Sequence, residues 1–380
     1  MPLSFSQCFD PDAIRAGVAR LAQYRAADVR AALHSPGNAV ETAAALFSPC
    51  AGGMLEELAQ TARRLTVERF GRTIALYAPL YLSNECVCTC TYCGFSMGLD
   101  IKRRTLRIDE VLREAGALGS AGFRNILLVS AEHPKYVSTP YVAQCIRETK
   151  NVAHYVGLEI AAADEEEYAA YVAAGCDGVV LYQETYEPQC YAAHHLGGPK
   201  KKYHWRLDAP ERASRAGIKH LGIGALLGLT DWRFEALSLL AHLRYLEKNC
   251  WKSQINISFP RINAAEGGYM PERPVSDAEL VQLICAFRIA APSAGIVLST
   301  REPAELRDGL VKLGVTHMSA GSSTEPGGYS EPGKAGEQFH LEDQRSPQRV
   351  ANRLRELGYD PVFKDWERMQ PGAGVFAAVR

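Results

Sequence analysis

The sequence contains no apolar stretch long enough to cross a membrane and almost no excess of charge. Its 42 Lys and Arg residues balance 43 Asp and Glu residues, which gives a formal net charge of -1. A chain without a basic surplus lacks the general attraction that draws proteins to nucleic acids and anionic membranes. Residues 1–7 have neither a basic region nor an apolar run, so we expect no secretory signal. We therefore expect a cytoplasmic protein that binds neither nucleic acid nor a membrane.

Disulfides are not expected either, although the chain has eleven cysteines. An odd number cannot pair completely, and Cys145 and Cys285 lie within helical patterns. Without a secretion signal, reduced thiols together with a metal centre are the better interpretation.

Three of the cysteines form the most informative motif of the chain. Cys86, Cys90 and Cys93 are separated by three and then two residues, so the motif supplies three ligands where an ordinary electron-transfer cluster uses four. Three thiolates on one loop can bind three irons of a [4Fe-4S] cluster and leave the fourth iron open. A structural zinc site is the alternative, but such sites use two cysteine pairs or a cysteine pair with a histidine pair. The spacing, with the aromatic Tyr92 before the last cysteine, resembles the radical S-adenosylmethionine (SAM) superfamily.

The rest of the chain alternates between short apolar runs and amphipathic helices. Runs that are apolar on both faces are typical of a parallel sheet covered by helices. Before several runs stands a glycine that we expect to close a helix in the left-handed conformation. Eight such units predict an α/β fold, a (β/α)8 TIM-type barrel, with an open partial barrel as the alternative. The expected strands are 73–82, 125–130, 156–162, 178–181, 221–229, 254–262, 296–298 and 317–320, and the glycines are Gly122, Gly175, Gly217, Gly295 and Gly314.

Two segments flank the expected barrel domain of residues 73–324. Residues 1–72 lack strand patterning and indicate an N-terminal helical extension with breaks near residues 35–38 and 48–49. Residues 325–380 begin with a polar segment rich in glycine and proline that is too long for a simple connection. We expect it to be a lid over the barrel mouth rather than disordered, followed by one helix over 347–357. Within the barrel, the clearest helices span 164–174 and 231–248.

Barrel enzymes carry their working residues at the C-terminal ends of the strands, so the cysteine loop after the first strand would lie at the mouth. Glu132 follows the second strand and Glu184 follows the fourth. Carboxylates at these positions can bind an ammonium group or a pair of ribose hydroxyls. Solvated loop carboxylates are the alternative.

The resemblance to the superfamily extends to these residues. Glu132, in Ser130-Ala131-Glu132, stands where superfamily members carry a Gly-Gly-Glu-like motif near the amino group of SAM. Residues 202–208 resemble the segment of biotin-synthase relatives whose arginine pairs with the SAM carboxylate, a role that falls to Arg206. A surface arginine is the alternative. The resemblance thus implies that Tyr92, Glu132, Glu184 and Arg206 bind SAM.

Motifs along nearly the whole chain resemble one family within the superfamily. They are residues 81–84 before the cysteines, 101–106 after them and 360–366 near the end. Together they resemble the tyrosine lyase of thiamine biosynthesis, the 2-iminoacetate synthase family. The resemblance implies cleavage of the Cα–Cβ bond of L-tyrosine to 2-iminoacetate (dehydroglycine) and p-cresol, with a [4Fe-4S] cluster and SAM as cofactors. Dehydroglycine then supplies carbon and nitrogen to the thiazole ring.

Three other assignments compete with this family. The tyrosine lyase that matures [FeFe]-hydrogenase has additional C-terminal cysteines, whereas the last cysteine here is Cys285. Tryptophan lyase is the alternative within the superfamily, and a non-catalytic iron–sulfur or zinc module is the alternative outside it. Cys88 stands where the family commonly has asparagine, so the sequence leaves open whether this thiol substitutes for one of the three ligands.

The resemblance also implies which residues hold the substrate. In aromatic-amino-acid lyases of this group, an arginine, a serine and a tyrosine bind the carboxylate and amino group, which points to Arg301, Ser319 and Tyr81. Arg261, at the end of the sixth expected strand, is a rival anchor. For Tyr81 the alternative is a core aromatic residue, and for Ser319 it is a small residue in a tight barrel mouth.

The same family resemblance implies two macromolecular partners, thiazole synthase and a flavodoxin- or ferredoxin-type electron donor. The basic run Lys102-Arg103-Arg104 fits either a docking site for an acidic flavodoxin or an ordinary solvated charge run.

Overall fold

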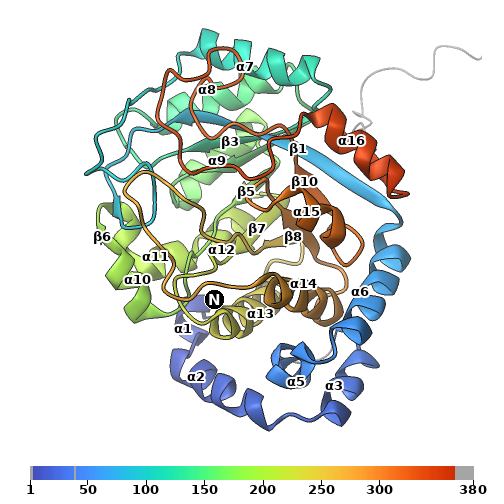
Figure 1. The fold of residues 1–380 in the computed structure, drawn as a ribbon. Coiled ribbons are helices and arrows are strands. Elements are labelled where there is room, and N and C mark those ends of the chain that lie inside the picture. Colours follow the sequence, from blue (N-terminus) through green and yellow to red (C-terminus); the bar gives the residue numbers. More distant parts are fainter. Residues whose placement is uncertain (1–2, 38–39, 364–380) are drawn as a thin grey trace, which may run out of the picture.

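The computed structural model describes residues 3–37 and 40–363 (Figure 1). Eight parallel strands pair in their sequence order, and the last pairs with the first, Ala75 and Tyr77 opposite His317 and Ser319. The predicted complete (β/α)8 barrel is therefore confirmed, and the open partial barrel is wrong. The barrel strands are β1 (Thr73–Ser83), β3 (Asn125–Ser130), β4 (Tyr155–Glu159), β5 (Gly178–Val180), β7 (His220–Gly224), β8 (Gln254–Ser258), β9 (Gly295–Leu298) and β10 (His317–Ser319).

Three strands end well before the residue at which the sequence predicts their end. β4, β7 and β8 end at Glu159, Gly224 and Ser258, although the apolar patterning extends to residues 162, 229 and 262. The chain leaves the sheet early at these points because the following residues build loops at the mouth, where Leu226 and Leu227 remain buried.

Three of the five predicted helix-closing glycines adopt the left-handed conformation, with φ of 100° at Gly122, 105° at Gly175 and 101° at Gly217. The prediction is wrong for Gly295 and Gly314, whose φ values are not positive. Gly295 is instead the first residue of β9, where a Cβ atom would lie 2.1 Å from Asn256 Oδ1. Glycine there leaves room for the Asn256 side chain of the neighbouring strand, and the backbone conformation does not call for it.

Helices cover the outside of the barrel (Figure 1). Asp164 caps α9 (Glu165–Ala174) by accepting a hydrogen bond from Glu167 N, and Asp231 caps α13 (Trp232–Asn249) in the same way. Both predicted helices are confirmed. The other helices of this layer are α7 (Ile108–Ser120), α8 (Thr139–Thr149), α10 (Pro188–His194), η3 (Pro199–Lys201), α11 (Tyr203–Leu207), α12 (Ala209–Arg215), α14 (Asp277–Ala290), α15 (Ala304–Leu310) and α16 (Pro347–Glu356).

The N-terminal helices pack on the outside of α13 and α14 (Figure 1). Phe5 stacks on His242 of α13 with ring centroids 4.1 Å apart. The predicted break at residues 48–49 is present, because Ser48 caps a new helix that starts at Pro49. These helices are α1 (Phe5–Cys8), α2 (Pro11–Arg20), η1 (Leu21–Gln23), α3 (Ala26–Leu33), α4 (Val40–Ala43), η2 (Ala44–Phe47), α5 (Pro49–Gly52) and α6 (Leu55–Phe70).

After β10, residues 324–346 form no helix or strand and run beside the cysteine loop. Gln338 O accepts a hydrogen bond from Gly94 N (3.1 Å), and Gly336 N donates to Lys102 O (2.9 Å). The helix predicted at 347–357 is confirmed as α16, and β11 (Asp360–Val362) then pairs in parallel with β1. Motif residues 364–366 lie outside the described residues.

The core divides into a large cluster between barrel and helices and a smaller one at the mouth. The smaller cluster includes Tyr81, Phe95 and Val129, with Cys86 and Cys93 packed against it. The cysteine loop therefore packs on apolar side chains. All eleven cysteines are free, and no helix in the described part of the chain is long and apolar enough to cross a membrane.

Candidate active site at the mouth of the barrel

The cysteine loop is fixed from two sides. Its short strand β2 (Thr89–Cys90) pairs antiparallel with β6 (His195–Gly197), which belongs to the connection after β5. From the other side, the Arg103 guanidinium donates to the carbonyls of Asn84 (2.6 Å), Phe95 (2.8 Å) and Ser96 (2.7 Å). Arg103 therefore braces the loop, and neither sequence interpretation of the basic run describes it.

The three predicted cluster ligands lie together on this loop. The Cys88 amide donates to Cys86 Sγ and the Phe95 amide donates to Cys93 Sγ, each at 3.4 Å. A hydrogen bond from the Cys88 thiol lowers the pKa of Cys86 to about 6, against the effect of burial. Burial raises the pKa of Cys90 to about 12 and also raises that of Cys93, but bound iron deprotonates a coordinating thiol. Sulfur donors with amide hydrogen bonds fit a [4Fe-4S] cluster.

The zinc alternative finds no support. Within residues 3–37 and 40–363, no three His, Cys, Asp or Glu side chains are grouped so that they could hold one metal ion. A structural zinc needs such a group, whereas a cluster gives each thiolate its own iron.

Cys88 is buried, and its thiol donates to Glu132 Oε2 at 3.5 Å. Its hydrogen bond to Cys86, burial and the Glu132 charge raise the pKa of Cys88, which favours the protonated thiol.

Three of the predicted SAM-binding residues converge beside the loop. Arg206 Nη1 lies 3.3 Å from Glu132 Oε1, and Arg206 Nη2 lies 3.4 Å from Glu184 Oε1. Arg206 Nε also donates to Tyr182 O at 2.8 Å. Arg206 is buried, so its interpretation as a surface residue is wrong. Lys200, which the sequence analysis did not single out, completes the group at 2.7 Å from Glu184 Oε1.

Two carboxylates and two cations therefore compensate one another in a buried position. Burial acts to raise the pKa of Glu184, but Lys200 and Arg206 outweigh it and lower that pKa. Burial acts to lower the pKa of Arg206, but the Tyr191 phenol and the carboxylates of Glu184 and Glu132 outweigh it. Glu184, Lys200 and Arg206 are consequently charged at neutral pH.

The backbone of Glu184 is itself constrained. With φ of 71°, it is the one residue other than glycine that has a positive φ in the described chain. Its carbonyl accepts from Leu226 N at 2.7 Å, which ties this conformation to the loop after β7. Such strain persists where surrounding structure holds it, and here it aims the carboxylate at Arg206.

Tyr92 lies on the same side of the loop. Its hydroxyl is 2.8 Å from His195 Nε2, and His195 Nδ1 is 2.8 Å from Tyr191 O. Burial and the charge of Lys200 lower the pKa of His195 to about 3, so the ring is neutral. A neutral ring donates from Nδ1 to the carbonyl and accepts the Tyr92 proton at Nε2. The Lys200 ammonium lies 5.8 Å from the Tyr92 ring centroid.

The three predicted substrate anchors line a single cavity at the mouth. Tyr81 donates its hydroxyl to Gln338 Oε1 at 2.6 Å, and Ser319 Oγ accepts from Thr300 N at 3.0 Å. The Arg301 guanidinium stacks over the Phe339 ring, 3.3 Å from its centroid. The rest of the lining comes mainly from strand ends and from the segment after β10: Tyr77, Pro79, Leu127, Val129, Glu159, Tyr182, Ser258, Ser299, Ser322, Thr324 and Leu341.

The rival anchor Arg261 is occupied elsewhere. Its Nε lies 3.0 Å from both carboxylate oxygens of Glu302, and its Nη1 donates to Asp277 Oδ1 at 2.7 Å. It does not line the cavity of Arg301 and Ser319.

Sequence reasoning missed Glu159, Lys200 and Gln338 in this region. Glu159 carried a usable signal, because it is a carboxylate inside an otherwise apolar strand. Lys200 lies in the run Lys200-Lys201-Lys202, which resembles a solvated charge run. Gln338 lies in the polar segment after β10, where the sequence has no period that would orient a side chain.

Comparisons with known proteins agree with this architecture. Residues 80–241 match the Radical SAM superfamily, and residues 258–360 match the Biotin and Thiamin Synthesis associated domain. Among solved structures, HydG, a maturase of the [FeFe]-hydrogenase, superposes with a TM-score of 0.88 at 32% identity over 93% of this chain and 80% of that one. Methylornithine synthase superposes with a TM-score of 0.66 at 19% identity and shares the fold.

Curated relatives give the more specific result. The 2-iminoacetate synthase of Salmonella typhimurium is 43% identical over 90% of this chain and 91% of its own length. That of Escherichia coli is 44% identical over the same shares of both proteins. At this identity and coverage, the chain belongs to the 2-iminoacetate synthase family of radical SAM enzymes.

Proposed function

We propose that this chain is a lyase that cleaves the Cα–Cβ bond of L-tyrosine to 2-iminoacetate and p-cresol, a step towards the thiazole of thiamine. The 44% identity with the Escherichia coli 2-iminoacetate synthase over 90% of the chain carries this proposal. The cofactors are a [4Fe-4S] cluster and SAM. When bound, they supply a 5′-deoxyadenosyl radical, which removes a hydrogen atom from the substrate.

Cys86, Cys90 and Cys93 hold the cluster in this proposal. Amide donors at Cys86 and Cys93 support it, because hydrogen bonds to cluster sulfurs stabilise their negative charge. Cys88 stays protonated and is not a ligand.

Arg206, Glu132, Glu184 and Tyr92 bind SAM. Arg206 serves the SAM carboxylate, and its two carboxylate neighbours hold the guanidinium in place before the cofactor arrives. Glu184 is suited to the ribose hydroxyls because a carboxylate accepts two hydrogen bonds at once.

Arg301, Ser319 and Tyr81 anchor the amino acid, with Arg301 on its carboxylate. A cavity shared by all three supports this assignment. Holding the substrate at several points confines the radical to one hydrogen and one bond.

We assign residues 1–72 to a helical extension, 73–324 to the barrel and 325–380 to a lid with its following helix. Gln338, Phe339 and Leu341 line the substrate cavity, so a docked lid would exclude water from a reactive intermediate. As partners we propose thiazole synthase, which would use the 2-iminoacetate, and a flavodoxin- or ferredoxin-type electron donor, which would reduce the cluster.

The test is to supply the reconstituted enzyme with reductant, SAM and either L-tyrosine or L-tryptophan. Tyrosine should yield p-cresol and glyoxylate, the hydrolysis product of dehydroglycine, whereas tryptophan should yield little lyase product. A site that hydrogen-bonds a phenol leaves buried polar groups unpaired when an indole occupies it. Arg301→Ala should suppress p-cresol far more than 5′-deoxyadenosine, because it loosens the amino acid and not the cofactor.

Robust 3-methylindole-type products from tryptophan, with no p-cresol from tyrosine, would overturn the assignment as a tyrosine lyase. An Arg301→Ala enzyme that loses both products equally would contradict the role of Arg301 as a carboxylate anchor.

A further inference from the structure

Glu159 is the last residue of β4, and its side chain lines the cavity of the substrate anchors. Val156 and Leu158 are buried with no exposed surface, and the strand alternates so that Tyr155, Gly157 and Glu159 share the other face. Tyr155 also lines a cavity inside the barrel. The period of the strand therefore turns Glu159 into the barrel, although the neighbours of Glu159 in sequence are apolar.

The Glu159 carboxylate has no protein partner within the described part of the chain, neither a hydrogen bond nor an ion pair. The other two carboxylates at this mouth are different, because Glu132 and Glu184 are both paired with Arg206. Glu159 is half-buried, with its exposed part facing the cavity. Carboxylates directed into a protein are usually hydrogen-bonded, so one that faces a cavity without a protein partner is a candidate ligand-binding group.

Arg301 has the complementary property. Its guanidinium stacks on Phe339 but, among the described residues, takes part in no ion pair or side-chain hydrogen bond. Burial lowers the pKa of Arg301, and the nearby Tyr81 and Glu159 act against that effect. One cavity thus presents an uncommitted cation and an uncommitted anion that do not pair with each other.

The charges around Glu159 are consistent with a site that awaits a cation. Burial, and then the Glu184 charge, raise the pKa of Glu159 to about 7, while Arg301, Lys200 and Arg206 act in the opposite direction. The phenols of Tyr77, Tyr81 and Tyr182 also lie within range of its charge. An ammonium group in the cavity would add the direct partner that the protein does not provide.

We infer that Glu159 binds the α-ammonium group of the substrate, so that Glu159 and Arg301 recognise the two charged groups of a free amino acid. This inference rests on the proposed function and adds to it a specificity-determining residue. It predicts selection for a free α-amino acid over its deamino and decarboxylated analogues.

Binding measurements separate this role from others. Isothermal titration of the anaerobic enzyme with cluster and SAM, without reductant, gives Kd for L-tyrosine and for 3-(4-hydroxyphenyl)propionate, which lacks the amino group. One charge-assisted pair corresponds to a discrimination of about tenfold or more in the wild-type enzyme. In Glu159→Gln the two ligands should bind within about threefold of each other, while SAM affinity and iron content are unchanged.

Two further variants serve as controls for the effect of Glu159→Gln. Glu159→Asp keeps the charge on a side chain shorter by one methylene, so it should retain more discrimination than Glu159→Gln. It also decides the matter if Glu159→Gln loses iron or fails to fold. Arg301→Ala should instead abolish the discrimination between L-tyrosine and tyramine, which lacks the carboxylate, while it preserves the discrimination against 3-(4-hydroxyphenyl)propionate.

Undiminished discrimination in Glu159→Gln would overturn the inference, and so would a loss of SAM affinity in place of that discrimination. Failure of the wild-type enzyme to bind tyrosine and produce p-cresol would overturn the proposed function, and this inference with it. The two failures are distinguishable because the second is seen before any variant is made.

Discussion

Two arginines at the barrel mouth differ in what holds them. Arg206 is paired with Glu132 and Glu184, whereas the Arg301 guanidinium stacks on Phe339 and forms no ion pair among the described residues. A paired guanidinium has its charge compensated and its position fixed by the protein. An unpaired one keeps its hydrogen-bond donors for a ligand. The same residue type therefore supports two different proposals a short distance apart.

The assignment of Cys86, Cys90 and Cys93 as cluster ligands predicts that substitutions of Cys93 and Cys88 differ in their effect on iron content. Cys93→Ala should lose the cluster, whereas Cys88→Asn should retain nearly full iron content, because the Cys88 thiol keeps its proton in a hydrogen bond to Glu132 and does not ligate iron. Iron per chain and low-temperature EPR of the two variants provide the check. Equal loss of iron from both would show that Cys88 is a ligand.

Glu235 of α13 predicts a specific pH dependence of stability. It is 2% exposed, it accepts from the Thr185 hydroxyl and from Tyr186 N, and burial raises its pKa from 4.5 to about 8. Between these pH values the folded protein keeps a proton that the unfolded chain releases. The stabilisation is complete below about pH 4.5 and is lost as the pH rises towards 8.

Glu235→Gln, which cannot titrate, should consequently flatten the fall of the Tm between pH 5.5 and 8. Scanning fluorimetry across that range measures the slope, with the exposed Glu305→Gln as the matched control. If the Tm of wild type and of Glu235→Gln changes with pH in the same way, the ionisation of Glu235 does not affect the stability of the folded protein.

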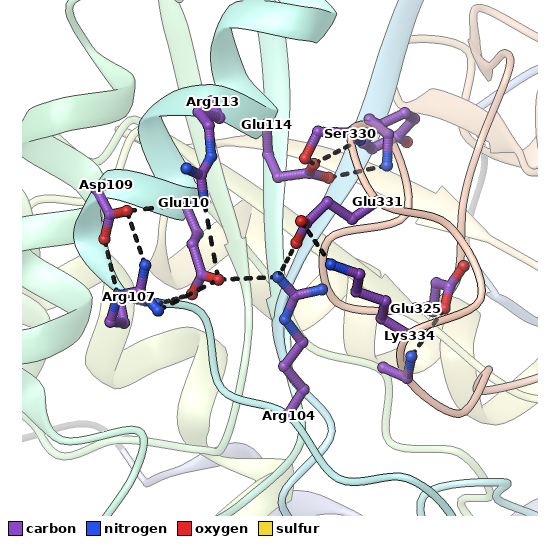
Figure 2. Close-up of polar contacts among 12 residues, drawn as sticks. Arg104, Arg107, Asp109, Glu110, Arg113, Glu114, Glu325, Ser330, Glu331 and Lys334 are labelled. Carbon is purple, nitrogen blue, oxygen red and sulfur yellow. Dashed lines mark hydrogen bonds and ion pairs between the residues drawn. The ribbon is translucent and has the colours of Figure 1, made fainter.

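At the scale of elements, the segment after β10 is fastened to α7 by a compact polar network (Figure 2). The Glu114 carboxylate accepts from Tyr329 N (3.0 Å) and from the amide and hydroxyl of Ser330. Arg104 joins Glu110 of α7 (2.9 Å) to Glu331 (2.6 Å). These contacts hold the segment whose next residues line the substrate cavity.

Loosening this network should uncouple the cleavage of SAM from the cleavage of tyrosine. Glu114→Ala leaves three donors without their acceptor, at about 1–3 kcal/mol for each group that stays buried. Hydrogen exchange of residues 324–340 should become faster, and the ratio of 5′-deoxyadenosine to p-cresol should rise.

The control for that experiment is Arg113→Ala. Arg113 is an exposed residue of the same helix, and its ion pairs with the described residues are long, at 3.7 and 3.8 Å. If exchange at residues 324–340 is the same in both variants, the network does not hold the segment.

At the scale of the whole molecule, the first N-terminal helix is docked on the helices that cover the barrel. Phe5 is 3% exposed and lies against His242 of α13, while its amide donates to Glu211 Oε1 at 2.6 Å. A helix of four residues cannot form alone, so tertiary contacts stabilise it.

Phe5→Ala should therefore lower the stability by about 3–5 kcal/mol, as expected for a large buried aromatic. The readout is the Tm together with hydrogen exchange in residues 3–20. Leu3→Ala, at a position that is 61% exposed, should leave both unchanged. An equal effect of the two substitutions would mean that α1 is not docked through Phe5.

Features that depend on neighbours along the chain were determined by the sequence itself. The spacing of Cys86, Cys90 and Cys93 keeps three thiols close along the chain in any fold. Apolar runs alternating with helices led to a barrel, because strands that are apolar on both faces must be covered. The expected closure and the helices over 164–174, 231–248 and 347–357 all follow from such local patterns, and the structure confirms them.

Only the tertiary structure decided which charges meet. Barrel closure brings Glu159, Arg301 and Ser319 to one cavity, although β4 and β10 are far apart in sequence. It also determines that Arg103 holds the cysteine loop and that Arg261 pairs with Glu302. The same holds for Gly295, which leaves room for the Asn256 side chain of β8. Local patterns carry no information on these pairings, because a side chain's electrostatic partner depends on which strand ends the barrel brings together.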